Sequence, residues 1–138
     1  MGNNSKKKVL FLCTQNSARS QMAEGWLRAL RGESYEAYSA GTQPWRVNPL
    51  AVKAMARAGV DISSHRSKGV EEFSGQEFDL VVTVCDNARE SCPYFPNAKS
   101  FLHHSFTDPA AASGSEEERL AVFEKVRDEI REWIEQTF

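Results

Sequence analysis

The amino-acid sequence predicts a single α/β domain in which a parallel sheet carries helices on both faces. Three observations predict this fold class. Short apolar runs typical of buried strands alternate with segments whose apolar residues recur at helical spacing. The length of 138 residues suits about one domain. The chain also contains no internal repeat and no long linker. Strands and helices that alternate in this way form a three-layer domain.

The predicted elements follow one another closely. Residues 9–12 form a continuous apolar run typical of a buried parallel strand, and residues 20–31 follow with apolar side chains at helical spacing. The later elements are predicted, in chain order, as a strand at 35–40, a helix at 49–58, a short helix at 67–73, a strand at 79–85, a short helix at 86–92, a strand at 99–103 and a final helix that starts at 113–115. Cys13 and Cys85 follow or end predicted strands at their carboxyl ends, where such folds bind ligands.

Two of the helices carry boundary signals in the sequence. Pro49 suits the first turn of one helix, and Gly59 suits the position just after its end. Ser115 and Glu118 have the spacing of a capping box at the start of the final helix. An apolar stripe then follows along that helix, which predicts that one face is buried. Its members are Leu120, Phe123, Val126, Ile130, Trp133 and Ile134.

Composition places the chain among ordinary globular proteins. Charged residues make up 26% and hydrophobic residues 41%, and the formal net charge of −2 excludes a strongly basic nucleic-acid-binding module. The apolar runs span about five residues, whereas a membrane-spanning helix needs about 20. Residues 1–8 are polar and basic with no long apolar stretch behind them, so we expect a flexible tail rather than a signal peptide. We therefore expect one domain at 9–138, no membrane partner and a cytoplasmic location.

Residues 13–20, Cys-Thr-Gln-Asn-Ser-Ala-Arg-Ser, join the first predicted strand to the first predicted helix. Backbone N–H groups at a helix N-terminus point at one spot, and the helix dipole favours negative charge there. A thiol in that position loses its proton more easily, and Arg19 adds a fork of donors that matches a tetrahedral oxyanion. The segment therefore predicts a Cys13 nucleophile aimed at a phosphate-like ion. We also expect Ser20 to hydrogen-bond Cys13 and Asn16 to adopt a left-handed conformation.

The alternative interpretation is a buried cysteine at a strand end and an arginine on a solvated helix face. A cysteine followed at this distance by an arginine is weak evidence alone, but its position between a buried strand and a helix favours a functional site. A Walker-type phosphate loop is excluded because the sequence lacks its glycine and lysine pattern.

The segment 13–25, Cys-Thr-Gln-Asn-Ser-Ala-Arg-Ser-Gln-Met-Ala-Glu-Gly, resembles the low-molecular-weight protein tyrosine phosphatase family, and more closely its thioredoxin-coupled arsenate reductases. The resemblance runs from about residue 9 to about residue 133. It also includes Tyr38-Ser-Ala-Gly41, Val47-Asn-Pro49, Asp61-Ile-Ser63 and Asp108-Pro109. It implies a four-stranded parallel sheet flanked by helices. It assigns oxyanion binding to Thr14, Gln15, Asn16, Ser17, Ala18, Arg19 and Ser20, and catalysis to Cys13, Arg19, Cys85, Cys92 and Asp108.

Three cysteines form a poor disulfide framework and indicate catalytic or metal-binding thiols in a reducing compartment. For Cys85 or Cys92 alone, a small buried apolar residue is the simpler interpretation. If 85–92 is helical, seven steps of about 1.5 Å separate the two Cα atoms by about 10 Å. A disulfide needs roughly 4.4 to 6.8 Å. We therefore predict that this segment is helical when reduced and looped when oxidised.

The resemblance implies a relay among these thiols. Cys13 attacks arsenate, Cys85 then attacks Cys13 so that arsenite leaves, and Cys92 finally takes over the disulfide with Cys85. Reduced thioredoxin restores the thiols by thiol–disulfide exchange, with glutaredoxin or mycothiol as alternative reductants. The thiols supply both electrons, so we expect no metal and no tightly bound cofactor. Phosphate and sulfate are expected as competing anions.

Asp108 precedes Pro109 after the last predicted strand, a pair that by itself usually marks only a turn. In the phosphatase relatives the matching aspartate is the general acid for the leaving group. In a reductase, Asp108 would assist either protonation of the leaving oxygen or activation of Cys85. Ala110 and Ala111 stand where the tyrosine phosphatases place paired aromatic residues. This departure counts against a phosphotyrosine substrate.

A second departure concerns a cation. In some reductases of the family, positions that match Asn16, Glu24 and Ser39 help to hold a potassium ion, with an aspartate as the fourth position. That fourth position aligns with Lys68 here. Our hypothesis is that the Lys68 ammonium replaces the metal and pairs with Glu24, so that potassium has no effect. The alternative is an exposed lysine on a helix.

Two other functions share part of these features. A phosphatase acting on phosphoesters or phosphotyrosine needs Cys13, Arg19 and Asp108 but not the other thiols. A redox-sensing or anion-binding module would form disulfides without releasing arsenite. The three histidines, including His65, lack metal-ligand spacing to the cysteines. Trp26, Trp45 and Trp133 are predicted in or against the core. No oligomer signal stands out, and we expect a monomer.

Overall fold

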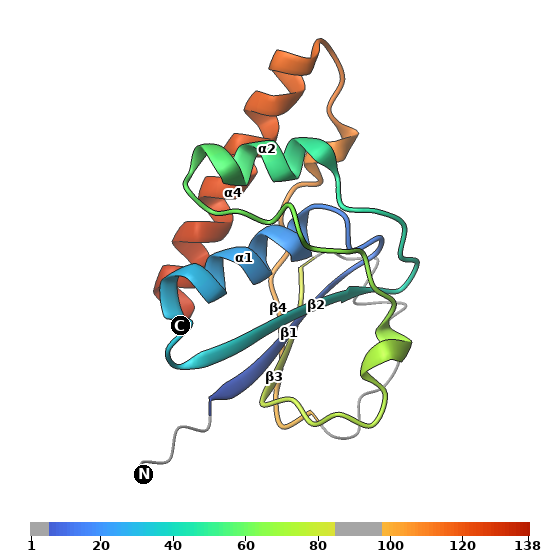
Figure 1. Ribbon diagram of the computed structural model, residues 1–138, viewed down its shortest axis with the longest axis vertical. Coiled ribbons are helices and arrows are strands. Elements are labelled where there is room, and N and C mark those ends of the chain that lie inside the picture. The colour runs from blue at the N-terminus through green and yellow to red at the C-terminus, as the bar shows by residue number, and fades with distance from the viewer. Residues whose placement is uncertain (1–5, 85–97) are drawn as a thin grey trace.

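The computed structural model describes residues 6–84 and 98–138, and Figure 1 shows their arrangement. Cys85, Cys92 and the predicted helix at 86–92 lie outside the described residues. Within the described ranges, no helix is long and apolar enough to cross a membrane.

The sheet has four parallel strands, as the family resemblance implies. They are β1 (Lys7–Cys13), β2 (Tyr35–Gly41), β3 (Leu80–Thr83) and β4 (Phe101–His103), in the order β2-β1-β3-β4. The apolar run in β1 forms the centre of the core, where Leu10, Phe11 and Leu12 are completely buried. A run that is apolar on both faces suits a strand with neighbours on both sides and cover above and below.

The first strand begins earlier than predicted. Residues 7 and 8 were expected in the flexible tail, but Lys7 pairs with Tyr35 and Lys8 with Glu36 in the sheet. Lys8 also donates its backbone N–H to the Asp79 carboxylate at 2.7 Å. At the end of a sheet the side chains can remain in solvent while the backbone completes the ladder, so a polar sequence does not prevent pairing.

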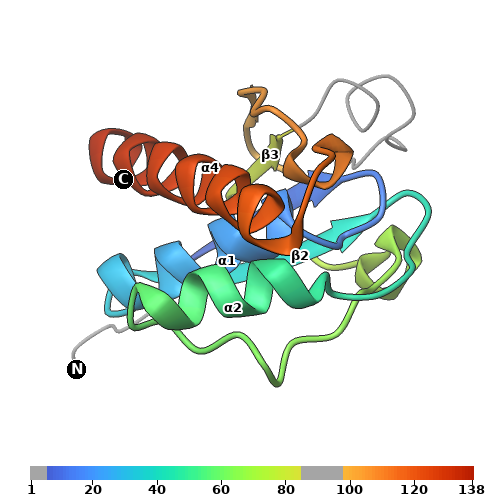
Figure 2. The same ribbon diagram turned by 90° about the horizontal axis from the view of Figure 1, so that it is seen from above.

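The three α-helices of the described residues lie together on one side of the sheet, as Figures 1 and 2 show. They are α1 (Arg19–Arg31), α2 (Pro49–Arg57) and α4 (Glu116–Thr137). The capping box predicted at Ser115 and Glu118 is present, and the apolar stripe of α4 is buried except for Trp133, which packs against the core while partly exposed. A hydrogen bond links α1 to α4: Trp26 Nε1 donates to the backbone oxygen of Arg127 at 3.1 Å.

The opposite face of the sheet carries an aromatic cluster. Tyr38 on β2, Phe73 and Phe78 meet in edge-to-face contacts with ring centroids 5.7 to 5.8 Å apart. Phe73 belongs to η1 (Val70–Phe73), a single 3-10 turn. The short helix predicted at 67–73 is therefore wrong in its first half, because residues 67 and 68 instead hydrogen-bond the loop after β1.

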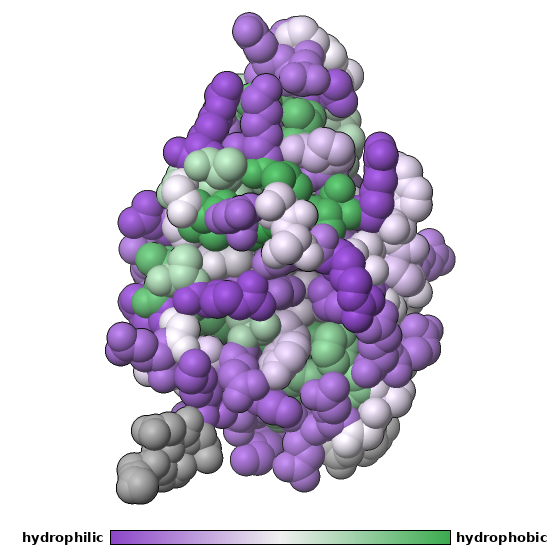
Figure 3. Space-filling view, in the orientation of Figure 1, coloured by the Kyte–Doolittle hydropathy of each residue, from purple (hydrophilic) through white to green (hydrophobic). Residues whose placement is uncertain are grey.

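The face of the molecule in Figure 3 is mostly hydrophilic. Trp45 is an exception to the core prediction, because 62% of the residue is exposed. It lies in the connection between β2 and α2, where its ring stacks with the Arg46 guanidinium at 4.5 Å. Trp26 is buried as predicted. The core prediction for Trp45 rested on its residue type, which does not show that the residue follows the end of a strand and is exposed.

Candidate anion-binding active site

The carbonyl groups of the loop that joins β1 to α1 are hydrogen-bonded to donors outside the loop. The carbonyl oxygens of residues 13–17 accept hydrogen bonds from Thr42 N, Gln43 N, Trp45 N, Gln21 Nε2 and Asn48 N at 3.3, 2.7, 3.3, 3.1 and 2.9 Å, in chain order of the acceptors. The peptide bonds are trans, and in a trans unit the N–H points opposite to the C=O. The N–H groups of residues 14–18 therefore turn to the other side, which is the arrangement that binds anions.

The start of α1 strengthens this anion site. Ala18 is the N-cap residue and makes no side-chain capping hydrogen bond. The positive end of the helix dipole is thus left without a capping carboxylate or hydroxyl from that residue, and it favours a bound anion.

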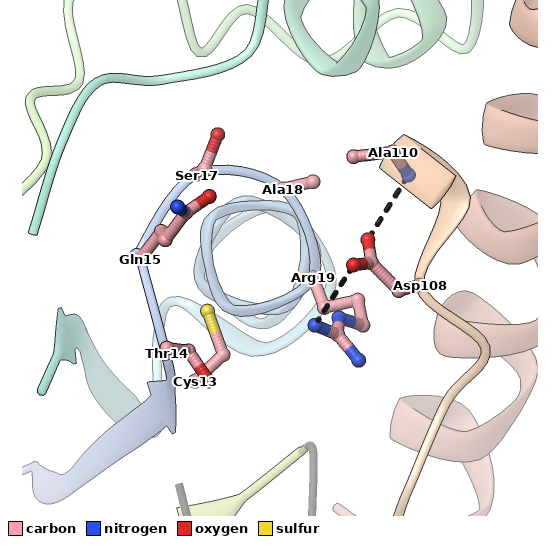
Figure 4. A pocket seen from close by; sticks show the side chains of 8 residues that line it. All are labelled: Cys13, Thr14, Gln15, Ser17, Ala18, Arg19, Asp108 and Ala110. Atoms are coloured by element: carbon pink, nitrogen blue, oxygen red, sulfur yellow. Dashed lines mark hydrogen bonds and ion pairs between the residues drawn. The ribbon is translucent and has the colours of Figure 1, made fainter. Parts of the chain in front are cut away.

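A pocket of about 240 Å³ opens between this loop and the 108–110 turn. Figure 4 shows the loop curving around the end of α1, with the Cys13 sulfur pointing toward the middle of the curve. The residues that line the pocket are Cys13, Thr14, Gln15, Ser17, Ala18, Arg19, Asp108 and Ala110. Cys13 is a free thiol and 2% exposed, so the reactive atom predicted from the sequence lies at the floor of the cavity.

Ser20 and Asn16 support the thiol from below. Ser20 Oγ lies 2.9 Å from Cys13 Sγ, and Asn16 Nδ2 donates to Ser20 Oγ at 2.8 Å. Asn16 has a φ of 50°, the left-handed conformation that was expected of it. Both residues are completely buried. The Ser20 hydroxyl is therefore held within hydrogen-bonding distance of the sulfur by Asn16.

Gly41 allows β2 to approach the loop closely. It pairs with Cys13 in the sheet, and its N–H donates to Lys68 O at 2.8 Å. A Cβ atom at this position would lie 2.6 Å from Thr14 O and 2.7 Å from Asn16 N. Only glycine fits this position without displacing the backbone that carries the anion-binding N–H groups.

Arg19 and Asp108 face each other across the pocket mouth, as Figure 4 shows. Arg19 Nη2 lies 3.7 Å from Asp108 Oδ2, and Arg19 Nη1 donates to Phe106 O at 3.2 Å. Asp108 Oδ1 accepts from Ala110 N at 3.0 Å and so caps η2 (Pro109–Ala111). The structure thus brings Asp108, from a distant part of the chain, beside Cys13 and Arg19, which lie at the two ends of the loop after β1.

A model of the family described as low molecular weight phosphotyrosine protein phosphatase matches residues 8–138. The chain belongs to this family. A curated relative, the arsenate reductase of Halalkalibacterium halodurans, is 50% identical over 125 residues, which are 91% of this chain and 90% of that protein.

Solved structures agree with this assignment. An arsenate reductase in the phosphate binding state is 33% identical, with a TM-score of 0.78 and coverage of 94% of this chain and 95% of that one. A thioredoxin-dependent arsenate reductase from Corynebacterium glutamicum is 26% identical, with a TM-score of 0.70, and the match covers 96% of this chain and 64% of that one.

The site departs from a phosphotyrosine pocket of this phosphatase family at its walls. Among the described residues that line the pocket, none is aromatic. Ala110 lies at the mouth, where the family resemblance places aromatic residues in tyrosine phosphatases. The described walls therefore offer no stacking surface to a phenyl ring.

Behind the loop, Glu24 is buried among cationic and polar groups. Arg28 Nη2 donates to its Oε2 and Ser39 Oγ to its Oε1, both at 2.5 Å, and Lys68 Nζ lies 3.8 Å from Oε1. Burial lowers the pKa of Lys68, and the facing Glu24 carboxylate raises it. The Lys68 side chain therefore reaches the carboxylate with which it was expected to pair.

These residues do not fit a bound alkali cation. Asn16 Oδ1 already accepts from Lys68 N at 2.8 Å and from Gln21 Nε2 at 2.9 Å, and the Ser39 hydroxyl donates to Glu24. The Lys68 ammonium supplies the positive charge at this point. A metal ion beside it would meet a like charge.

Sequence reasoning missed two polar residues that support the loop. Gln21 is completely buried on α1, and its side-chain nitrogen donates to both oxygens of Asn16. His65 Nδ1 lies 2.9 Å from Gln21 Oε1. A polar residue in a buried helical turn was a signal for Gln21, whereas nothing in the sequence pattern pointed to His65.

Proposed function

We propose that this protein reduces arsenate to arsenite with three cysteine thiols, using Cys13 as the nucleophile. The observation that carries the proposal is the free Cys13 thiol at the floor of a small pocket walled by N–H groups and Arg19. The high identity to an arsenate reductase over nine-tenths of both chains supports arsenate as the substrate.

The first step is attack by the Cys13 thiolate on arsenic. The N–H groups of residues 14–18 and Arg19 hold the arsenate oxygens, so that arsenic lies in line with Sγ. A sulfur–arsenic bond forms, and one oxygen leaves as water once it is protonated. Asp108, at the pocket mouth and next to Arg19, is the described carboxyl group placed to supply that proton.

Two further thiols complete the reduction in this proposal. Cys85 attacks Cys13 Sγ, the sulfur–arsenic bond breaks, and its electron pair stays on arsenic, which leaves as arsenite. A disulfide between Cys13 and Cys85 results. Cys92 then attacks Cys85, which frees the Cys13 thiolate and leaves a disulfide between Cys85 and Cys92. Two thiols thus lose the two electrons that arsenic gains. Both residues lie outside the described part of the chain, and their roles rest on the family resemblance.

A protein dithiol of the thioredoxin class returns the Cys85–Cys92 disulfide to thiols. The structural likeness to a thioredoxin-dependent arsenate reductase supports this electron donor. The match covers 64% of that protein's chain, so thioredoxin as the electron donor of this protein is part of the proposal.

We also propose that Lys68 takes the place of a monovalent cation behind the loop. Its ammonium lies 3.8 Å from Glu24 and donates to Arg66 O at 3.0 Å. Initial rates of arsenate reduction in potassium chloride and in sodium chloride at equal ionic strength should therefore be the same. Strong activation by potassium would contradict this role for Lys68.

A second candidate function is a phosphatase that acts on small phosphoesters, because Cys13, Arg19 and Asp108 meet in one pocket. The two functions differ in the thiols that they require. The experiment is arsenate-dependent NADPH oxidation with thioredoxin and thioredoxin reductase, in parallel with hydrolysis of p-nitrophenyl phosphate. The variants are Cys13→Ser, Cys85→Ser and Cys92→Ser.

The reductase proposal predicts that all three variants lose arsenate turnover and that only Cys13→Ser loses phosphatase activity. The two resolving-thiol variants are thereby matched controls for an intact pocket. Absence of arsenate turnover in the unsubstituted protein, together with phosphatase activity that does not depend on Cys85 and Cys92, would favour the phosphatase.

A further inference from the structure

We propose that His65 is a positioning residue, whose neutral ring with a proton on Nδ1 orients the hydrogen bond that reaches Cys13. It acts through Gln21, Asn16 and Ser20 and does not touch the anion. The inference rests on the proposed function only in treating Cys13 as the nucleophile.

A continuous chain of short contacts joins His65 to the thiol. In order, the contacts are His65 Nδ1 to Gln21 Oε1 at 2.9 Å, Gln21 Nε2 to Asn16 Oδ1 at 2.9 Å, Asn16 Nδ2 to Ser20 Oγ at 2.8 Å, and Ser20 Oγ to Cys13 Sγ at 2.9 Å. The side chain of His65 is 8% exposed, and the other four residues are 2% exposed or less. Water therefore has little access to replace a lost link.

The orientation of the Gln21 amide is set by three oxygen atoms. Its Nε2 faces Asn16 O at 3.1 Å, Asn16 Oδ1 at 2.9 Å and Arg66 O at 2.9 Å. A carbonyl oxygen in that place would meet three acceptors and no donor, so the nitrogen must occupy it. Gln21 Oε1 then faces His65, and as an acceptor it requires a proton on Nδ1.

The other ring nitrogen gives the same assignment. Arg28 Nη1 lies 2.9 Å from His65 Nε2, and a guanidinium only donates. Nε2 must therefore be unprotonated, which makes the ring neutral. The charged groups around it act in opposite directions: Glu24, 3.8 Å away, and Asp61 favour a proton, whereas Arg28 and Lys68 oppose one. Burial, the largest influence, lowers the pKa of His65.

The proton on His65 Nδ1 sets the donor and acceptor of every later hydrogen bond in this series. Asn16 Oδ1 accepts from Gln21 and from Lys68 N, which turns Asn16 Nδ2 toward Ser20. Ser20 Oγ accepts from that nitrogen and keeps its own proton for Cys13 Sγ. Every donor in this series of hydrogen bonds therefore points toward the Cys13 sulfur, and this alignment favours the thiolate.

Loss of the His65 donor would leave Gln21 Oε1 buried without a partner. Such a group costs more than the bond itself contributed. The amide cannot relieve this by flipping, because its oxygen would then face three other oxygens. Gln21 must move, and Asn16 loses the contact that aligns it with Ser20.

The test compares two amide substitutions that differ in reach. In His65→Asn the side-chain nitrogen can take the place of Nδ1, and in His65→Gln it reaches the place of Nε2 and leaves Gln21 Oε1 without its donor. The measurement is the pH dependence of alkylation of Cys13 by iodoacetamide in the full chain, followed by mass spectrometry of the peptide that contains Cys13.

We expect His65→Asn to keep the alkylation midpoint of the unsubstituted protein. In His65→Gln the midpoint should rise by about one pH unit, so that alkylation at a pH below both midpoints is about tenfold slower, with the same plateau rate at high pH. Equal midpoints in all three proteins, or equal shifts in the two variants, would overturn the proposal. The second result would mean that His65 serves only to fill space.

A double-variant cycle tests whether the effect passes through Gln21. Gln21→Met removes the amide while keeping the length of the side chain. Adding His65→Gln to it should cause no further shift, because coupled residues are not additive. Fully additive shifts would overturn the pathway.

One measurement needs no substitution, and so stands even if a variant does not fold. In long-range ¹H–¹⁵N spectra of the unsubstituted protein at pH 7, His65 should show a protonated Nδ1 and an unprotonated Nε2. A proton on Nε2 would overturn the proposal. None of these readouts requires arsenate turnover, so a failure of the proposed reductase activity is distinguishable from a failure of this inference.

Discussion

Replacing Gly41 with alanine tests whether the backbone of the anion loop must hold its position to within an ångström. The added Cβ would lie 2.6 Å from Thr14 O and 2.7 Å from Asn16 N, and contacts of this kind become ordinary only at 3.4 Å. Relief therefore requires a shift of about 0.8 Å in backbone atoms, since neither neighbour is the end of a flexible side chain.

Such a shift affects binding geometry more than global stability. Overpacking of this kind costs roughly 1–3 kcal/mol of unfolding free energy. A misplacement of about 1 Å in a catalytic site can cost about 100-fold in rate, which corresponds to about 2.7 kcal/mol of transition-state stabilisation. We expect kcat/KM for arsenate to fall about 100-fold in Gly41→Ala. Inorganic phosphate should also protect Cys13 less well from alkylation by iodoacetamide in this variant.

Gly59→Ala is the matched control. Gly59 has a φ of 85° and no atom within 4 Å of the added Cβ, so alanine there costs about 1–2 kcal/mol of backbone strain without touching the loop. This variant should lose stability but keep its kcat/KM. The reasoning fails if Gly41→Ala, folded by circular dichroism, shows the kcat/KM and phosphate protection of the unsubstituted protein.

Three further outcomes are expected. Ser115→Ala removes one half of the capping box of α4 and should lower the free energy of unfolding in urea by about 1 kcal/mol, with unchanged arsenate turnover. Lys68→Met leaves the buried Glu24 with one cationic partner fewer and should lower the same free energy by roughly 1–3 kcal/mol; unchanged stability would show that the ion pair contributes nothing. Because the pKa of His65 lies below its ordinary value of 6.5, its contribution to stability is fully present above about pH 6.5 and is lost as the pH falls through the lower folded-state value. His65→Asn should lack that part of the loss in urea titrations between pH 7.5 and pH 5.5, and an identical pH profile would contradict the shift.

The sheet and its site were predictable because their signals are local. The apolar run, the cysteine and the helix N-terminus follow one another within a short stretch of β1 and α1. Their arrangement can therefore be predicted without knowing how the rest of the chain folds. The left-handed Asn16 and the contact between Ser20 and Cys13 belong to the same stretch.

The features that were missed depend on distant parts of the chain. His65 and Gln21 are 44 positions apart, and no periodicity links them. Trp45 looked like a core residue by type, but it follows β2 into a connection held by backbone hydrogen bonds, where it is largely exposed and its ring stacks with Arg46. Residues 7 and 8 looked like a tail because strand pairing at a sheet end does not depend on apolar side chains.

The segment at 42–48 holds the anion loop through its main chain, since four of its N–H groups reach carbonyls of residues 13–17. Main-chain bonds do not depend on which side chains the segment carries. The exposed side chains of the segment, those of Gln43, Trp45 and Arg46, are thus open to evolutionary change or to a designed library, while the backbone geometry of the loop after β1 is kept.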